Sequence, residues 1–177
     1  MNRTVRAMSL SEIPRMIDYF RSATPDHLRG MGVEPHKLPD AGRWYGLVAA
    51  DFEKPLEQRS LFYTVWILDD QLVGHSHIND IVYSQSASMH LHLWQPDNRQ
   101  RGNGSYFIKQ SIALYFDCFQ LKELYCEPYA LNPAPNKTLA RIGFDFLKEY
   151  ETTPGWLSFS QPVNRWVLTK DRFETLF

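Results

Sequence analysis

The stretch Arg99-Gln100-Arg101-Gly102-Asn103-Gly104-Ser105 decides the fold of this chain. It follows an apolar segment that favours a strand and precedes a run with helical spacing. A helix N-terminus carries unpaired N–H groups and partial positive charge. Gly102 and Gly104 let that backbone approach a ligand closely because no Cβ intervenes, and Arg99 and Arg101 add charged donors. The stretch therefore predicts an anion-binding loop suited to a pyrophosphate.

Two better-known phosphate loops do not match this stretch. A Walker A loop needs Gly, four residues and then Gly-Lys-Ser/Thr, and the chain contains no such run. A dinucleotide fingerprint needs a third Gly three residues after Gly104, where this chain has Phe107. Taken alone, the loop also fits an ordinary helix entry with solvated arginines.

The segments before the loop predict a helical start followed by a three-stranded antiparallel meander. A short edge strand comes first, then a helix capped by Ser9 or Ser11, because apolar residues follow there at helical spacing. A segment rich in Pro and Gly then predicts short helical turns and loops that shape a pocket. The edge strand is expected over 4–8, the turns over 23–54, and the meander over 61–68, 72–82 and 87–94.

The segments after the loop alternate between helix and strand. Asn132-Pro133 favours a helix start and Gly143 a helix stop. The expected elements are a helix over 105–119, a strand over 124–127, a helix from 133 to 142, and strands over 144–151 and 165–169. This order predicts the α+β class.

Composition excludes several classes of protein. With 177 residues, 19 basic and 20 acidic side chains, and 14% aromatic residues, we expect one compact domain over 1–177 that is not disordered. The net charge of −1 argues against nucleic acid held on a broad basic surface. No apolar run approaches the roughly 18 residues of a membrane span. Cys118 and Cys126 form no paired motif, so a soluble cytoplasmic protein without structural zinc is expected.

Two motifs in order carry a resemblance to a known family. Arg99-x-x-Gly102-x-Gly104 resembles the acetyl-CoA pyrophosphate loop of the GNAT acyltransferases, and Asn132 to Gly143-Phe144 resembles their second signature, with one helix and one strand between the two. The pairing is similar to the branch of ribosomal-protein N-terminal acetyltransferases. The resemblance implies a mixed, mostly antiparallel sheet of six to seven strands, flanked by helices and splayed between the fourth and fifth strands.

The resemblance also implies acetyl-CoA as co-substrate, no metal, and a set of cofactor-binding positions. The pantetheine arm would follow the backbone of the strand before the loop and enter a slot made by the splay. The amides of two asparagines would line the other side of the arm. The implied residues are Gln100, Arg101, Gly102, Asn103, Gly104 and Ser105 at the pyrophosphate, Arg99 positioning the loop, Leu93 and Trp94 on the strand, and Asn132 and Asn136 beside the arm.

The implied reaction is direct attack of a primary amine, from a protein N-terminus or a small molecule, on the acetyl thioester. Many family members use a Tyr four residues before the Gly of the second signature as the acid, and this chain has Leu139 there. The proton donor is then another group or water, with Tyr125 and Tyr129 as candidates. Glu127, at the end of the strand beside the splay, is the first choice of base, although it also fits a structural carboxylate.

Four histidines lie two apart on two successive strands: His75 and His77, then His90 and His92. With an even turn between the strands, all four imidazoles would share one sheet face. They could supply a base, with His92 as first choice, or bind a metal.

The sequence leaves three functions open. The first is an N-acetyltransferase, which could be a homodimer. The two alternatives are a non-catalytic acyl-CoA-binding module, because Leu139 replaces the usual acid, and a metal-binding β protein that uses the four histidines.

Overall fold

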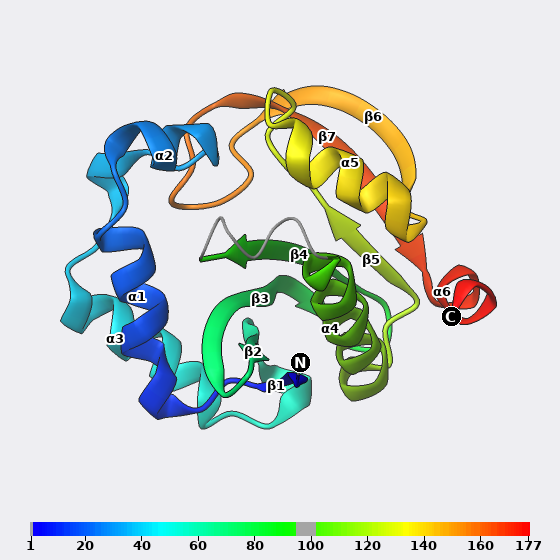
Figure 1. The fold of residues 1–177 in the computed structure, drawn as a ribbon, viewed down its shortest axis with the longest axis horizontal. Coiled ribbons are helices and arrows are strands. Elements are labelled where there is room, and N and C mark those ends of the chain that lie inside the picture. Colours follow the sequence, from blue (N-terminus) through cyan, green and yellow to red (C-terminus); the bar gives the residue numbers. More distant parts are fainter. Residues whose placement is uncertain (1, 95–101) are drawn as a thin grey trace.

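The computed structural model of the chain describes residues 2–94 and 102–177. Seven strands form one sheet in the order β1-β2-β3-β4-β5-β7-β6, with helices on both faces (Figure 1). The α+β class predicted from the sequence is therefore confirmed.

An antiparallel meander makes up one half of the sheet. The edge strand β1 (Arg3–Ala7) pairs with β2 (Phe62–Leu68), which pairs with β3 (Gln71–Val82), which pairs with β4 (Ser86–Leu93). The turn between β2 and β3 is tight because Asp69 and Asp70 both adopt positive φ, a conformation that Asp tolerates better than most residues. All of these strands were expected from the sequence.

The sheet splits at its parallel pair of strands, because the two strands pair over only part of their length. β5 (Glu123–Cys126) runs parallel to β4, and its pairing covers only Ser86 to Met89 of that strand. β4 continues to Leu93, and no strand in the described part of the chain pairs with this second half on the β5 side. The two strands therefore separate after Met89 and Cys126, which is the predicted splay between the fourth and fifth strands.

Helices α4 (Asn103–Phe119) and α5 (Pro133–Ile142) cover one face of the sheet. α5 begins at Asn132-Pro133 and ends at Gly143, whose φ of 108° suits a helix C-cap, as expected. The core on this face is densely aromatic. It includes Phe62 and Trp66 from β2 and Phe107, Tyr115, Phe116 and Phe119 from α4.

The N-terminal helices cover the opposite face (Figure 1). They are η1 (Leu10–Glu12), α1 (Ile13–Arg21), α2 (Pro25–Gly30), η2 (Pro35–Lys37) and α3 (Ala41–Phe52), whereas η3 (Leu56–Gln58) packs its Leu56 against the core on the α4 side. The expectation of only short turns over 23–54 was wrong for α3, which has 12 residues. Gly42 and Gly46 lower its intrinsic helix propensity, but buried Trp44 and Val48 anchor it to the sheet, and packing outweighs propensity.

The C-terminal part closes the sheet with β6 (Asp145–Thr152) and β7 (Gln161–Thr169). β7 is longer than expected, because its pairing with β6 extends the strand back through Pro162 to Gln161. A last helix, α6 (Lys170–Leu176), was not predicted; the hydroxyl of Thr169 caps it by accepting the Arg172 N–H at 3.2 Å. None of the helices over the described residues is long and apolar enough to cross a membrane.

Candidate functional site

A cavity of about 450 Å³ lies on the α1/α3 face of the sheet and extends to the splay. Its floor comes from β3 and β4, and one wall comes from the segment that follows β5. The segment 23–54, which the sequence predicts to shape a pocket, contributes Met31, Val33 and Trp44. The remaining walls include Met16, Phe20, Leu47, Val48, Leu61, Tyr63, Trp156 and Leu157.

The predicted pyrophosphate loop is described only in its second half. Arg99, Gln100 and Arg101 lie outside the described residues. Gly102 precedes α4 with a φ of 71°, a conformation that favours glycine, and Gly104 lies in the first turn. Among the described residues, apart from chain neighbours and the backbone of α4 itself, no atom lies within 4 Å of a Cβ built on either glycine, so these residues leave space in front of this backbone.

The first turn of α4 has polar groups available for a ligand. Its leading N–H groups have no partner within the helix. The Asn103 side chain is 1% exposed, and neither its amide nitrogen nor its oxygen has a hydrogen-bond partner among the described residues. An open, donor-rich turn of this kind fits a pyrophosphate, with Asn103, Gly104 and Ser105 nearest to it.

The end of β4 has a more restricted role than the sequence suggested. The Trp94 backbone N–H donates to the Val73 carbonyl at 2.9 Å, and its indole N–H donates to His75 Nδ1 at 2.8 Å. A contact between Trp94 and a cofactor arm therefore cannot use these N–H groups. Leu93 packs its side chain toward the α4 core, so any contact it makes with the arm involves its backbone.

The two candidate asparagines differ in how their amides are used. Asn136 donates to the carbonyls of Tyr129 (3.1 Å) and Asn132 (2.8 Å), and its oxygen accepts from Asn164 and from the Trp166 indole. It thus joins α5, β7 and the segment after β5. Asn132 also lines the cavity, and its side chain makes no capping bond to α5, so its amide is available to a ligand.

Glu127 lies at the end of β5 and lines the cavity. Its Oε1 accepts from Arg165 Nη1 and from the Tyr150 hydroxyl, both at 2.6 Å, while its Oε2 has no partner among the described residues. Arg165 also packs over the ring of Tyr125, whose hydroxyl donates to Glu123. One oxygen of Glu127 is therefore structural, and the other is available to a ligand.

Tyr129 is the tyrosine that borders the cavity beside Glu127. Its backbone bridges to Val163, its ring packs edge-on against Phe159, and its hydroxyl has no hydrogen-bond partner in the described part of the chain. Leu139, at the position where the family's usual acid lies, is completely buried in the α4/α5 core. A proton donor can therefore come from Tyr129 but not from position 139.

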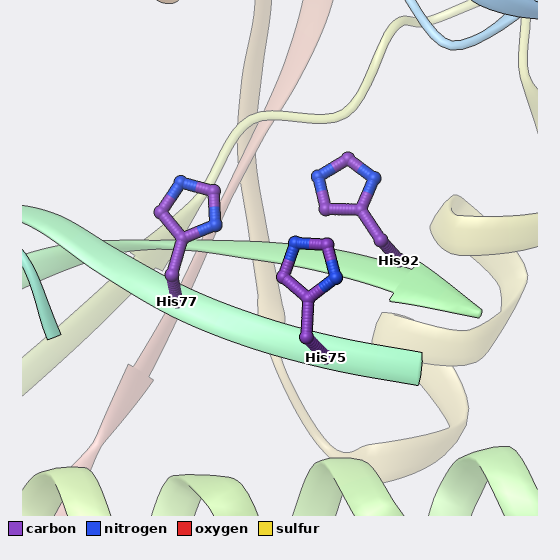
Figure 2. A group of neighbouring side chains, drawn as sticks. All are labelled: His75, His77 and His92. Atoms are coloured by element: carbon purple, nitrogen blue, oxygen red, sulfur yellow. The ribbon is translucent and has the colours of Figure 1, made fainter. Parts of the chain in front are cut away.

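The four histidines share one sheet face, as expected. His75 lies opposite His92 and His77 opposite His90, and all four line the cavity. Figure 2 shows His75, His77 and His92 pointing into a common space from two neighbouring strands. Burial, with His90 and His27 as smaller causes, lowers the pKa of His92 to about 3, and burial lowers the pKa of the other three as well. The cavity floor is thus uncharged at neutral pH.

Their spacing alone would allow a metal, because one nitrogen from each of His75, His77 and His92 lies within 4.8 Å of the others. The hydrogen bond that the Trp94 indole donates to His75 argues against metal binding. An indole N–H only donates, so His75 Nδ1 is unprotonated and the neutral ring carries its proton on Nε2. Ligating histidines normally donate through their second nitrogen, which is the opposite arrangement. Coordination would require Trp94 to move away.

The aromatic residues of the sequence suggest five that wall the slot where acceptor and thioester meet: Trp44, Tyr45, Trp94, Tyr125 and Tyr129. Of these, Trp44 and Tyr129 line the cavity, whereas Tyr45 is 38% exposed outside it, Trp94 lies over His75, and Tyr125 packs under Arg165. Sequence reasoning missed Phe20, Tyr63 and Trp156. Phe20 and Tyr63 lie in elements that were predicted, but no local pattern indicates that they face a cavity.

Comparison with known proteins supports the fold. No family model matches the sequence, and no curated protein sequence matches it either. The structure is similar to spermidine N-acetyltransferase from Vibrio cholerae in complex with CoA and spermine, with a TM-score of 0.79, 15% identity, and coverage of 97% of this chain and 98% of the other.

Two further solved structures have the same arrangement. One is the ribosomal-protein alpha-N-acetyltransferase RimL in complex with coenzyme A, with a TM-score of 0.76, 15% identity, and coverage of 97% and 96%. The other is yncA from Salmonella typhimurium with its cofactor acetyl-CoA, with a TM-score of 0.72, 12% identity, and coverage of 96% and 94%. The chain therefore has the GNAT fold that its two motifs predicted.

Proposed function

We propose that the chain is an acetyl-CoA-dependent N-acetyltransferase that acts on a primary amine by direct attack. The observation that carries the proposal is the cavity that extends from the α1/α3 face to the splay between β4 and β5. A thioester entering through the splay and an amine in the cavity would meet in one enclosed space, as a direct reaction between two bound reactants requires. The structures it resembles were determined with CoA or acetyl-CoA, which supports the same co-substrate here.

The proposed cofactor site extends from the loop to α5. The pyrophosphate would lie on Gly102, Asn103, Gly104 and Ser105, with Arg99, Gln100 and Arg101 completing the loop. The arm would run along the free edge of β4 at Leu93 and past the amide of Asn132. Asn136, whose amide is fully used within the protein, would hold this wall in place rather than contact the arm.

Two residues that face the splay, Glu127 and Tyr129, would each carry out one of the two proton transfers. The amine nitrogen attacks the acetyl carbonyl, forming the C–N bond and breaking the C–S bond. The free Oε2 of Glu127 would take the proton that the nitrogen loses, directly or through water, and the unpaired hydroxyl of Tyr129 would give a proton to the leaving thiolate. Burial lowers the pKa of His92 to about 3, which disfavours its protonation and hence its use as the base.

The proposal includes a cytoplasmic location and no need for nucleic acid or a membrane. A homodimer is one assembly that it allows. The near-neutral net charge supports the exclusion of a broad polyanion surface.

The pyrophosphate loop provides the most direct test. We expect Gly104→Val to reduce CoA affinity at least about 100-fold, because its side chain would occupy the open space where the phosphates would lie. Gly46→Val is a matched control: it is also a helical glycine with no atom within 4 Å of an added Cβ, but it lies on α3. Calorimetric titration with CoA measures both variants. Unchanged affinity in Gly104→Val would remove the loop assignment.

A second candidate function is an acyl-CoA-binding module without turnover, which the burial of Leu139 favours. Thiol release from acetyl-CoA in the presence of a panel of primary amines separates the two functions. Tight CoA binding with no amine-dependent thiol release would support the module and overturn the enzyme.

The proton-transfer roles predict different effects on the pH–rate profile. We expect Glu127→Gln to remove the rise of rate with pH that the base produces, and Tyr129→Phe to lower kcat about 10²-fold or more with little change in CoA affinity. Tyr45→Phe, an exposed tyrosine on α3 outside the cavity, is the control. A profile unchanged by Glu127→Gln would exclude this carboxylate as the base.

A further inference from the structure

We infer that the acceptor carries one amino group on an uncharged, apolar body of aromatic size. The inference rests on the proposed function and specifies the substrate class of the same cavity. It follows from the charges that line the cavity, from the partners of those charges, and from the apolar side chains at its rim.

The first carboxylate of the cavity is fully engaged within the protein. Asp51 is 4% exposed, and Lys54 Nζ donates to its Oδ1 at 2.6 Å. The backbone N–H groups of Ser60 and Leu61 donate to its two oxygens at 3.2 and 2.7 Å. A substrate ammonium would have to displace these bonds, so Asp51 fixes the start of β2 rather than recognising a cation.

The second carboxylate provides a single free position. Glu127 shares its Oε1 with Arg165 and Tyr150, and only its Oε2 is left for a ligand. The Arg165 guanidinium next to Glu127 already neutralises most of the carboxylate charge with which a substrate cation would pair. The cavity can therefore hold one amino group at the splay and has no further acidic position in its described lining.

The rest of the floor adds hydrogen-bonding groups but no charge. His75 is buried, His77, His90 and His92 are half-buried, and their imidazoles are packed against one another at centroid distances of 4.6 to 6.1 Å. Crowding of this kind disfavours a second positive charge at the floor, since two charged imidazoles at these distances would repel each other. An acceptor with several ammonium groups would meet neutral polar rings at this floor.

The walls and rim are suited to an apolar ligand. Trp156 is 57% exposed and Leu47 52% exposed, yet both line the cavity, and the Trp156 ring packs edge-on to buried Trp44 at 6.1 Å. Large apolar side chains held at a cavity mouth gain by covering apolar ligand surface. The volume of about 450 Å³ falls in the range of small-ligand sites.

These features argue against a polyamine acceptor for this chain. Each additional ammonium group placed in an apolar cavity costs several kcal/mol unless a carboxylate pairs with it. The related Vibrio cholerae structure holds spermine, so the two proteins would share a fold and differ in the charge of their acceptors. An apolar first residue at a peptide N-terminus and a free arylalkylamine present the same chemistry to the cavity.

The test compares kcat/KM of the full chain with acetyl-CoA for four amines: 2-phenylethylamine, a peptide with N-terminal Phe, ethylamine and spermidine. We expect kcat/KM for 2-phenylethylamine or the peptide to exceed that for spermidine at least about 50-fold, and the ratio of these two apolar acceptors distinguishes the source of the amine. Equal or higher kcat/KM for spermidine would overturn the inference. Absence of turnover with every amine, with CoA still bound, would instead count against the proposed enzyme.

A rim variant tests whether the apolar body contacts the predicted wall. We expect Trp156→Ala to lower kcat/KM for 2-phenylethylamine about 10-fold or more while changing that for ethylamine less than twofold. Phe146→Ala, an equally exposed aromatic on β6 away from the cavity, is the matched control. Because Trp156 is exposed, the variant should fold, which its thermal unfolding checks. An equal loss for both amines would overturn the wall assignment.

Discussion

The sheet has a closed face under α4 and α5 and an open face under α1 and α3. The two faces differ in whether their buried polar groups have hydrogen-bond partners. On the α4/α5 face, Thr64 Oγ1 lies 3.0 Å from Ser111 Oγ and 3.1 Å from the Tyr115 hydroxyl, and the Trp66 indole donates to Ser111 at 2.9 Å. On the α1/α3 face, His75 Nε2, His77 Nδ1 and His92 Nδ1 are buried without partners among the described residues. One sheet therefore packs a hydrogen-bonded polar cluster of β2 and α4 on one side and a cavity floor with unpartnered imidazole nitrogens of β3 and β4 on the other.

The difference arises from the alternation of side chains along β3 and β4. Ile78 and Met89 point into the closed core, while their neighbours His77 and His90 point into the cavity. Buried polar groups without partners cost stability, and proteins keep them mainly where a ligand or reaction uses them. The comparison is consistent with the proposal that the acceptor amine binds on the open face, while the hydrogen-bonded core of the closed face contributes stability.

The largest effect is expected from acid, through the histidines of the open face. Because burial depresses the pKa values of the four histidines, the unfolded chain binds more protons than the folded one below about pH 6.5, and stability falls as the pH falls toward the folded pKa values, about 3 for His92. Each imidazole that stays neutral costs about 1 kcal/mol per pH unit in this range. We expect cooperative acid unfolding, measured by circular dichroism.

A pair of variants isolates the histidine contribution from that of carboxylates such as Glu12, whose pKa the Arg6 guanidinium lowers to about 2. His77→Gln should reduce the slope of unfolding free energy between pH 6 and 4 by about 1 kcal/mol per unit. His36→Gln is the control variant, because the His36 side chain is 78% exposed and lies outside the cavity, beside Glu34. Equal slopes in all three proteins would contradict the neutral floor.

The next effect compares a tryptophan on each face. Trp66→Ala should cost about 3–5 kcal/mol of unfolding free energy, because Trp66 is 1% exposed and stacks on Phe107 at 5.6 Å in the closed core. Trp44→Ala should cost less, because Trp44 borders a cavity that already lacks packing atoms on one side. Denaturant unfolding measures both, and a larger cost for Trp44→Ala would reverse the comparison.

A smaller effect tests how much the hydrogen bonds between buried polar groups of the closed face contribute to stability. Ser111→Ala leaves the buried Trp66 indole N–H without its acceptor and should cost about 1–3 kcal/mol. Ser22→Ala removes a hydroxyl that only donates to the Asp18 carbonyl on an exposed helix end, and should change stability by less than about 0.5 kcal/mol. If the two variants lose equal stability, the polar network of the closed face is not what distinguishes it.

The smallest effect on stability concerns the hydrogen bond that sets the His75 tautomer. Trp94→Phe keeps an aromatic ring next to Tyr19 and removes the donor to His75 Nδ1, at a cost of about 1 kcal/mol. The freed imidazole should then allow His75, His77 and His92 to bind Co²⁺ at least about 10-fold more tightly than the unmodified chain does. Visible absorption of Co²⁺ measures this. Equal affinity in both proteins would refute the tautomer argument.

The predictable parts of the fold are those with local causes. Pro133 at the first helical position and Gly143 at the C-cap delimit α5 locally, and the alternation along β3 and β4 is enough to place four histidines on one face. Helix α3 was missed because Gly42 and Gly46 weaken its local signal, and packing of Trp44 and Val48 restores it. β7 was cut short because its first half is defined by pairing with β6.

The residues of the candidate site also divide into those that the sequence predicts and those that it does not. Glu127 and Tyr129 could be named from their positions after a strand, but the pairing of Glu127 with Arg165 joins residues 38 positions apart and could not be predicted. The same holds for Trp156, which reaches the cavity rim from the segment between β6 and β7. Partners distant in sequence are decided by packing, for which a single sequence contains no local pattern.

The sequence by itself determined the α+β order of elements and the place of the glycine loop in that order, because turns, caps and strand alternation depend on residues close together in the chain, and two of its motifs carried the resemblance to the GNAT fold. Only the tertiary structure decided that the cavity floor is neutral, that one oxygen of Glu127 is free, and that Trp94 sets the His75 tautomer. Burial and partner choice are properties of the packed state, so the chemistry of the acceptor site appears only when distant segments meet.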